Sequence, residues 1–370
     1  MKKNLILICI DGGRQDRAIN CNILKKFFPN TVFFSNSITY APYTNSSVHA
    51  VISATNGSRN GCNSYWSSYD FKNEKFKTLT NYCKDENYRT YADIHSDLII
   101  PEQGFDDFEI YDEDKVDLSI RHPNIIEYLS KNEKPFFLYL HYESIHTTIR
   151  NEVLKKFNNF SKIYFDNKLN NEKRYDELFL NAEKYLENIF RKIKEKGLED
   201  NSTIVIFSDH GISFGEKFGE RAYGAFCYDY TIKTFFTIIS RELSQKIVTS
   251  QVRHIDIMPT ILEILGIKLD EKFEEIDGKS LVSELKDNKF REEFAFTETA
   301  NPLEGDEPPK IPNTKSIRKS DWKLIHNEYN NTKELYNLEN DPDEIENMID
   351  KKLDIQETLE CELNKRINQK

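Results

Sequence analysis

The sequence predicts an α/β protein whose mainly parallel central sheet is sandwiched by helices, with a small antiparallel subdomain at the C-terminal end. Apolar runs of strand length, such as 5–10 and 203–207, alternate with helical segments, and this alternation is typical of a parallel sheet. Beyond about residue 313 the chain changes to short strands with polar turns. We therefore expect a main domain at 1–300 and, packed on it, a small antiparallel sheet with a helix at 301–370.

Six segments are expected to form strands of the main sheet, because each is apolar or β-branched and bounded by polar residues. They are 5–10, 31–40, 88–95, 135–140, 203–207 and 232–239. Helices are expected between them, the clearest carrying one apolar stripe over 171–196. The others begin near Thr44 or span 73–86, 124–130 and 258–265, with a last helix from about 353. The small sheet is expected from 316–318, 322–325 and 334–337.

Composition limits the functional class. The chain has 370 residues, 38% of them hydrophobic and 31% charged, which is typical of a globular protein. The net charge is -11 without a basic stripe, which argues against a nucleic-acid partner but not against a small anionic substrate. The six cysteines form no CxxC pair or disulfide framework, and the apolar run at 5–10 is too short for a signal peptide. We expect a cytoplasmic protein with no membrane span, and an oligomer stays open.

Polar residues that suit a metal ion follow two of the predicted strands. Asp209 and His210 follow 203–207 after the single residue Ser208, and Asp11 comes directly after 5–10. Parallel strands place such residues at one edge of the sheet, where ligands bind in open α/β folds. A carboxylate beside an imidazole suits a divalent metal. The alternatives are a solvated loop for Asp209 and His210 and a turn or helix cap for Asp11.

Thr44 precedes a segment with apolar residues at helical spacing, so it lies at a predicted helix N-terminus. Thr44 or Asn45 could cap that helix. Alternatively, Thr44 presents its hydroxyl where the helix dipole and free N–H groups favour an anion. His95 ends the predicted strand 88–95, and His146 lies in the polar segment after the predicted strand 135–140, so both add polar groups near strand ends.

These residues belong to a series of motifs that runs nearly the whole chain. In order they are Ile10-Asp11-Gly12, Tyr88-Arg89-Thr90, Gly104-Phe105-Asp106, 135–140 with His146-Thr147, Ser208-Asp209-His210-Gly211 with Gly215-Glu216-Lys217, 256–262, 277–281, 322–325 and 334–338. The series resembles the sulfatase-like branch of the alkaline phosphatase superfamily. The resemblance implies an alkaline phosphatase-like fold with the catalytic domain at 1–300.

The resemblance also implies roles for single residues. Asp11, Asp209 and His210 would hold at least one divalent ion (Mn, Zn, Ca or Mg), with Thr44 as a fourth ligand. Too few further His and Asp residues match the family spacing to predict a second ion.

Two histidines stand at family substrate positions. His146 and His95 would stabilise the transferred group and protonate the leaving oxygen. Lys217 and Arg14 are candidate anion clamps, with a solvated surface role as the alternative for each. A last group of histidines is expected to be structural: His49, His141 and His254.

Departures from the family pattern direct the functional prediction. Sulfatases convert a Cys or Ser in a C/S-x-P-x-R signature to formylglycine, whereas this chain has Thr44-Asn45-Ser46-Ser47-Val48. Gly12 replaces the second Asp of the family pair, and Lys217 replaces a family histidine. Threonine is the nucleophile in phosphodiesterase-type nucleotide pyrophosphatases and in phosphoglycerol and phosphoethanolamine transferases.

We therefore predict a metal-dependent hydrolase, or transferase, of phosphate mono- or diesters that acts through a covalent phosphothreonine at Thr44. The partner would be a small anionic ester. One alternative is a sulfatase that works without formylglycine. A second alternative is an inactive homologue with a binding role.

Overall fold

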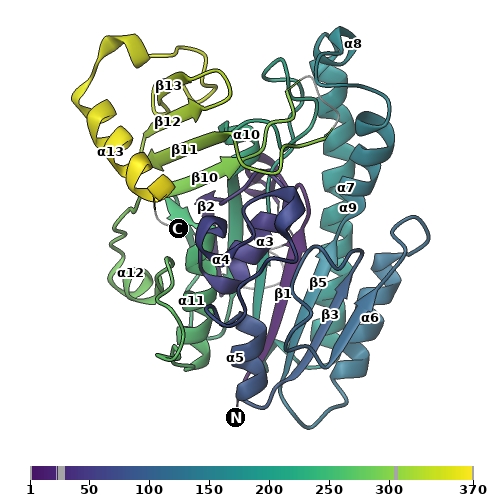
Figure 1. Cartoon of the computed structure of the whole chain (residues 1–370). Coiled ribbons are helices and arrows are strands. Elements are labelled where there is room, and N and C mark those ends of the chain that lie inside the picture. Colours follow the sequence, from purple (N-terminus) through teal and green to yellow (C-terminus); the bar gives the residue numbers. More distant parts are fainter. Residues whose placement is uncertain (1, 22, 24–29, 304–306, 369–370) are drawn as a thin grey trace.

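The computed structural model describes residues 2–21, 23, 30–303 and 307–368 (Figure 1). Within these residues the main sheet has nine strands. Their bounds are β1 Asn4–Ile10, β2 Thr31–Ile38, β3 Arg89–Ile94, β4 Asp107–Ile110, β5 Phe136–Tyr142, β6 Ser202–Phe207, β7 Lys233–Ile239, β8 Lys246–Val248 and β9 Val252–Arg253.

The strand order is β4-β3-β5-β1-β6-β7-β2-β8, and β9 also pairs with β2. All strands from β4 to β6 in this order run parallel, while β7 is antiparallel to both of its neighbours. Cys9 of β1 stands opposite His141 of β5 and Phe207 of β6. The residues that follow these three central strands therefore meet at one edge, and the mainly parallel sheet is confirmed.

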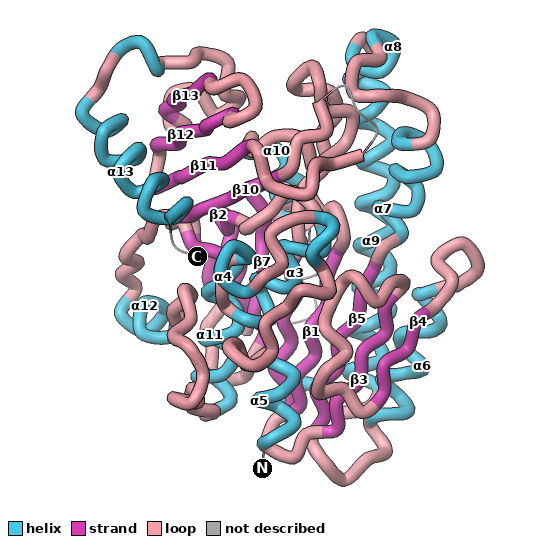
Figure 2. The backbone as a smooth tube through the Cα atoms, in the orientation of Figure 1, coloured by secondary structure: helices cyan, strands magenta, loops and turns pink. Residues whose placement is uncertain are grey.

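Helices cover both faces of the sheet (Figure 2). Ile6, Ile8 and Ile10 of β1 pack with α6 (Leu118–Leu129), α7 (Ser144–Ile149) and α9 (Lys168–Glu195). The alternate residues Leu5, Leu7 and Cys9 pack with α3 (Thr44–Ser53), α5 (Leu79–Asp85) and α11 (Ile257–Leu265). Because successive side chains of a strand point to opposite faces, an unbroken apolar strand needs both layers.

Short helical segments connect these elements. They are α1 Gln15–Ala18, α4 Gly57–Asn60, η1 Tyr65–Ser67, η2 Arg150–Leu154, α8 Lys162–Phe165, η3 Glu199–Asn201, α10 Asp229–Ile232, η4 His254–Asp256, α12 Val282–Asp287 and η5 Ile349–Lys351. Among the helices of the described ranges, none is both long and apolar enough to span a bilayer.

The small antiparallel sheet contains β10 (Ala295–Thr299), β11 (Thr314–Lys319), β12 (Trp322–Asn327) and β13 (Thr332–Asn337), in that order. The last helix, α13 (Asp354–Asn368), packs on it through Leu359 and Leu363. The same apolar cluster includes Tyr43, the residue before α3, and Ala50 from the middle of α3. The small sheet therefore supports the helix that begins with Thr44.

Buried charges join the small sheet to the main domain. The Lys323 ammonium on β12 is 0% exposed and lies 2.8 Å from Asp229 Oδ1 and 2.5 Å from Glu344 Oε1. Arg318 of β11 lies 2.6 Å from the other oxygen of Asp229. Two cations therefore compensate two carboxylates in a largely buried region, as buried charges require.

Two predicted helices differ clearly in extent from the observed ones, and one observed strand was not predicted. The helix predicted at 73–86 covers only Leu79–Asp85, because the hydroxyl of Thr78 accepts the N–H of Asn81 and caps it. The helix predicted from residue 124 begins at Leu118, after Asp117 accepts the N–H of Ser119. Strand β10 was not predicted and lies before the expected boundary at residue 301.

Candidate active site

Two carboxylates meet where β1 and β6 end. Asp11 follows β1 and Asp209 follows β6, two residues on, and both side chains are buried. Oδ1 of Asp209 accepts hydrogen bonds from the backbone N–H groups of Gly12, at 3.1 Å, and His210, at 2.9 Å. The backbone of the turn after β1 thereby helps to fix the carboxylate of Asp209, which follows β6.

Glycines make these tight turns sterically feasible. Gly12 has a φ of +71°, in the left-handed region that favours glycine. A Cβ on Gly211 would lie 2.2 Å from the carbonyl oxygen of Tyr230. Any larger residue at 211 would displace the turn that carries Asp209 and His210.

The imidazole of His210 has a defined orientation. Its Nδ1 lies 2.9 Å from the carbonyl oxygen of Gly211, which can only accept a hydrogen bond, so Nδ1 carries the proton. Nε2 faces the two carboxylates, 3.6 Å from Asp11 Oδ1 and 3.5 Å from Asp209 Oδ2. The ring of Tyr223 covers His210 with its centroid 4.5 Å away.

Thr44 completes this group. It is the first residue of α3, and its Oγ1 lies 3.4 Å from both Asp11 Oδ2 and His210 Nε2. The sequence left open a capping role for Thr44 or Asn45. Among the described residues, no side chain caps α3, and Asn45 instead donates to Ser68. Thr44 is partly exposed, so its hydroxyl is accessible from outside.

The donor set fits a divalent cation. Ligand atoms of Asp11, Asp209 and His210 all lie within 4.8 Å of one another. Within the described residues, Oδ1 of Asp11 and Oδ2 of Asp209 are buried without a hydrogen-bond partner. Such orphaned carboxylate oxygens are costly unless a cation fills the space between them.

The pKa values of the Asp11 and Asp209 carboxyl groups are shifted in opposite directions. Burial and the nearby charge of Asp11 raise the pKa of Asp209. Burial also opposes ionisation of Asp11, but the surrounding histidines outweigh it and hold the pKa of Asp11 below its usual range. We therefore assign the stronger negative charge to Asp11, which the imidazoles of His146, His141 and His210 surround.

His141 was expected to be structural, and it contacts one of the predicted metal ligands, Asp11. It lies near the end of β5, with Nε2 3.1 Å from Asp11 Oδ2 and Nδ1 3.1 Å from the hydroxyl of Tyr139. Burial lowers its pKa, but the hydrogen bond and charge of Asp11 raise it further, so the net shift is upward. His141 therefore orients Asp11 from the sheet side.

His146 and His95 lie next to this group. His146, on α7, has Nδ1 3.7 Å from Asp11 Oδ2 and 3.1 Å from the hydroxyl of Tyr223. The ring of His95, which follows β3, lies 5.7 Å from that of His146. Burial, aided by the nearby His141, lowers the pKa of His95 to about 3, so its imidazole is neutral near pH 7.

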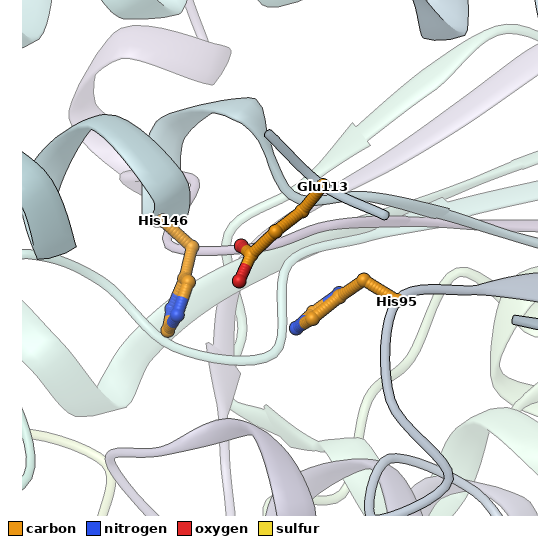
Figure 3. Close-up of side chains that lie close together, drawn as sticks. All are labelled: His95, Glu113 and His146. Carbon is orange, nitrogen blue, oxygen red and sulfur yellow. The ribbon is translucent and has the colours of Figure 1, made fainter. Parts of the chain in front are cut away.

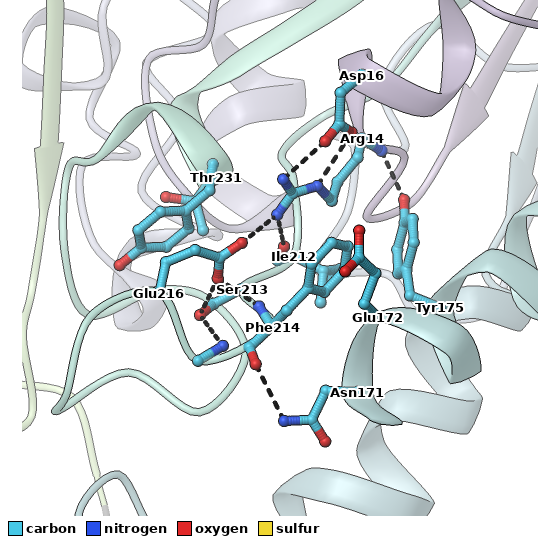
Figure 4. Close-up of polar contacts among 12 residues, drawn as sticks. Arg14, Asp16, Asn171, Glu172, Tyr175, Ile212, Ser213, Phe214, Glu216 and Thr231 are labelled. Atoms are coloured by element: carbon cyan, nitrogen blue, oxygen red, sulfur yellow. Dashed lines mark hydrogen bonds and ion pairs between the residues drawn. The ribbon is translucent and has the colours of Figure 1, made fainter. Parts of the chain in front are cut away.

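Arg14 makes its polar contacts elsewhere (Figure 4). Its guanidinium group donates to Asp16, to Glu216 at 2.8 Å and to the carbonyl oxygen of Ile212 at 2.8 Å. Burial opposes its charge, but these carboxylates raise its pKa. Arg14 thus joins the turn after β1 to the 212–216 turn.

Lys217 is also engaged away from the predicted metal ligands. Its Nζ donates to the carbonyl oxygen of Glu344 and lies 4.7 Å above the ring of Tyr228. Lys217 and Arg14 line one cleft of about 540 Å³. Substrate binding by these two residues stays a prediction from the sequence.

The other two histidines have packing contacts. His254 is buried, with Nε2 2.5 Å from the hydroxyl of Thr234. His49 is buried on α3, with Nδ1 2.7 Å from the carbonyl oxygen of Asn45. Their structural roles agree with the sequence analysis.

Family comparison accounts for the arrangement. A family model described as Sulfatase matches residues 3–267. The chain belongs to the sulfatase family. A second model, described as N-sulphoglucosamine sulphohydrolase, C-terminal, matches residues 224–370. The protein is thus a sulfatase-family hydrolase of sulfate or phosphate esters, and binding of a divalent metal is typical of this family.

Solved structures share the sulfatase fold. One, solved in complex with its substrate D-glucosamine-2-N,6-O-disulfate, has a TM-score of 0.78 and 16% identity, covering 99% of this chain and 97% of that one. The phosphonate monoester hydrolase of Agrobacterium radiobacter has a TM-score of 0.74 and 13% identity, covering 99% and 95%. Sulfur and phosphorus esters are thus both represented among similar folds.

One curated relative matches over a short segment. The extracellular sulfatase SULF-1 homolog of Drosophila melanogaster is 30% identical over 98 residues. This segment is 26% of the present chain and only 8% of that protein.

Proposed function

We propose that this sulfatase-family protein cleaves phosphate mono- or diesters, with the hydroxyl of Thr44 as nucleophile. One observation carries the proposal: Oγ1 of Thr44 lies 3.4 Å from both Asp11 Oδ2 and His210 Nε2. A hydroxyl at this position can act as a further ligand of the ion that Asp11, Asp209 and His210 would hold. The ion, when bound by Asp11, Asp209 and His210, would lower the pKa of the hydroxyl and neutralise a phosphoryl oxygen.

The side chain at residue 44 favours phosphoryl transfer. In the proposed first step, Oγ1 of Thr44 releases its proton to solvent and forms a bond to phosphorus. The bond from phosphorus to the leaving oxygen breaks, and that oxygen takes a proton from His146. The free N–H groups in the first turn of α3 would attract the negative charge of a phosphate ester. Water then attacks the phosphothreonine and releases inorganic phosphate, or the remaining monoester, and restores the threonine. An acceptor alcohol in place of water would make the same chemistry a transfer.

His146 is the proposed proton donor to the leaving oxygen. It is partly exposed, with 20% of its side chain accessible, and Tyr223 fixes its Nδ1 side. His95 is proposed to bind an oxygen of the transferred group, because a neutral imidazole donates a hydrogen bond without needing a charge. A role in positioning rather than in proton transfer fits its low pKa.

The test is turnover of three substrates by the purified, metal-loaded protein. These are bis-p-nitrophenyl phosphate, p-nitrophenyl phosphate and p-nitrophenyl sulfate. We expect turnover of a phosphate ester, a loss on the order of 10³-fold or more in Thr44→Ala, and retained turnover in Thr44→Ser. Thr249→Ala, on an exposed site, is the matched control.

The covalent step has its own readout. Rapid acid quench followed by peptide mass spectrometry should find a phosphoryl group on Thr44 during turnover. Sulfate turnover that survives Thr44→Ala would instead establish a sulfatase that uses another nucleophile. Failure of all three substrates together with an absence of bound metal would identify an inactive homologue.

A further inference from the structure

An exposed apolar patch lies around α8, at the top of Figure 1. It consists of Phe160, Ile163, Leu169 and Phe218, which are 40% to 74% exposed, and we call it the α8 patch. Single exposed apolar side chains are ordinary on a protein surface, whereas a group of them marks a site of interaction. The proposed ester cleavage makes no use of these residues, so their exposure needs another explanation.

Two separate chain segments form the α8 patch. The ring of Phe218 lies 5.7 Å from that of Phe160 and 4.9 Å from that of Phe165, measured between centroids. Tyr164 of α8 is buried, and its hydroxyl donates to the carbonyl oxygen of Ser213, 3.0 Å away. The segment that carries α8 is therefore anchored to the turn after β6, while its other apolar side chains face solvent.

Basic side chains surround the α8 patch. Segment 155–174 contains six cationic residues and two acidic ones, which gives a local charge of +4 in a chain of net charge -11. The cationic residues are Lys155, Lys156, Lys162, Lys168, Lys173 and Arg174. The local charge stays positive even when Glu152, which pairs with Arg174, is counted. Lys162 and Lys168 are exposed directly beside Ile163 and Leu169.

This combination favours a lipid surface as the occupant. Apolar side chains among lysines are typical of proteins that insert shallowly into bilayers of anionic lipids. Lysine is depleted in interfaces between proteins. A second copy of this chain would also bring the same positive charge against the patch, so a symmetric contact would repel itself. The negative headgroups of a bilayer complement the charge of segment 155–174 instead.

The α8 patch lies on the same side of the main sheet as the candidate active site. Helix α7 precedes segment 155–174 and carries His146. His146 lies beside His95 and Glu113, and one polar atom of each residue is within 4.8 Å of the other two (Figure 3). Phe218 belongs to the turn that follows His210. A surface that contacts the α8 patch would therefore lie next to the end of the molecule that carries these residues.

We propose that the α8 patch and the lysines of segment 155–174 dock the protein on the surface of an anionic lipid bilayer. The four apolar side chains enter the boundary between headgroups and acyl chains, and the ammonium groups contact lipid phosphates. The contact is peripheral and needs no membrane-spanning helix. It concerns where the protein is held, and it does not depend on the proposed cleavage of phosphate esters.

Vesicle sedimentation measures the docking directly. Full-length protein is mixed with vesicles of phosphatidylcholine alone, or of equal parts of phosphatidylcholine and phosphatidylglycerol, and the bound fraction is determined after centrifugation. We expect binding to the anionic vesicles and about tenfold weaker binding to the neutral ones. Added salt should release the protein from the anionic vesicles, because it screens the attraction between lysines and headgroups.

Two double variants separate the apolar contribution from the electrostatic one. Ile163→Ser with Phe218→Ser removes two of the side chains that enter the bilayer. Lys162→Gln with Lys168→Gln removes two charges and keeps the apolar side chains. Each double variant should bind the anionic vesicles about tenfold more weakly than the wild type. Since all four residues are exposed, we expect the variants to fold, and circular dichroism checks this.

Matched controls change the same kinds of residue outside the patch. Ile120→Ser with Tyr128→Ser alters two exposed apolar residues of α6. Lys131→Gln with Lys134→Gln removes two exposed charges just beyond this helix. Both control variants should bind the anionic vesicles as the wild type does.

Several results would overturn the proposal. Wild-type protein that stays in solution beside anionic vesicles would do so, as would wild-type binding by the folded variant Ile163→Ser with Phe218→Ser. Equal binding to both kinds of vesicle would refute a surface selected by charge. A dimer in analytical ultracentrifugation that this variant abolishes, without vesicle binding, would identify an interface between copies instead. Vesicle binding by protein that cleaves no ester would support docking and refute only the proposed activity.

Discussion

The hydroxyl of Ser47, one turn beyond Thr44, donates a hydrogen bond of 2.8 Å to the backbone carbonyl of Asp209. Oγ of Ser47 also lies 2.8 Å from the hydroxyl of Thr39 and 3.5 Å from Nδ1 of His254. Helix α3 is therefore joined directly to the turn that carries two of the predicted metal ligands. This link fixes the position of Thr44 relative to Asp209 and His210.

Replacing Ser47 should impair catalysis as well as stability. Ser47→Ala leaves the buried carbonyl of Asp209 without its donor, which costs about 1–3 kcal/mol. Because α3 loses a restraint on Thr44, kcat should fall by about tenfold to a hundredfold. Urea unfolding and steady-state kinetics measure the two effects. The control is Ser46→Ala, since buried Ser46 donates to Tyr43 and has no bond to Asp209. Equal kcat in the two variants would contradict the link.

Asp209→Asn should stabilise the metal-free protein while weakening metal binding. The amide oxygen of asparagine can still accept the N–H groups of Gly12 and His210. The substitution removes one of two buried negative charges, so we expect a gain of about 0.5–2 kcal/mol in chelator. With added Mn²⁺ or Zn²⁺, the rise in Tm should be smaller than in the wild type. A Tm rise of undiminished size would exclude Asp209 as a ligand.

Glu298 should make stability depend on pH. Burial raises its pKa to about 7, although the hydroxyl of Tyr40 donates to it. The folded state thus binds a proton more tightly than the unfolded state, whose carboxyl titrates near 4.5. The contribution of the Glu298 carboxyl group to the free energy of unfolding is therefore full below pH 4.5. It is lost as the pH rises to about 7, and the change is on the order of 3 kcal/mol.

Glu298→Gln tests this dependence, because glutamine keeps an acceptor for Tyr40 but does not titrate. We expect the variant to gain stability relative to the wild type between pH 5 and pH 8. Urea unfolding at intervals across this range measures the difference. Other buried carboxyl groups, such as Glu220, titrate equally in both proteins and cancel. Stability profiles that stay parallel would contradict the assignment.

Lys323→Met should destabilise the joint between the small sheet and the main domain. The substitution leaves Asp229 with Arg318 alone and Glu344 without its ammonium partner. Removing one member of a buried ion pair typically costs about 3–5 kcal/mol. The control Lys351→Met breaks an exposed pair with Glu346 and should cost less than about 1 kcal/mol. Chemical unfolding compares them, and similar losses would refute a special role for the buried network.

The sequence predicted those parts of the site that depend on strand ends. Asp11 and Asp209 lie within two residues of a strand end, and Thr44 begins a helix, so the order of apolar runs was enough to bring them to one edge. Helix α9 was predicted to within three residues because its apolar stripe is long and regular.

Other site residues depend on side-chain direction, which apolar patterns do not determine. His141 lies inside β5 at a buried position, and only the register of β5 against β1 shows that it faces Asp11. Glu113 lies in a loop after the short edge strand β4, without a periodic signal. A search for carboxylates just beyond strand ends could have found Glu113. The side chain of Lys217 is held by Glu344, more than a hundred residues away in the chain.

The unmodified hydroxyl of Thr44 bears on how this protein can be produced and inherited. Formylglycine requires the chemical conversion of a Cys or Ser residue, whereas a threonine nucleophile is encoded directly and needs no conversion. On the proposed mechanism, any expression host that supplies the metal ion should yield working protein without a maturation partner. The gene could likewise pass between genomes alone and still confer its activity.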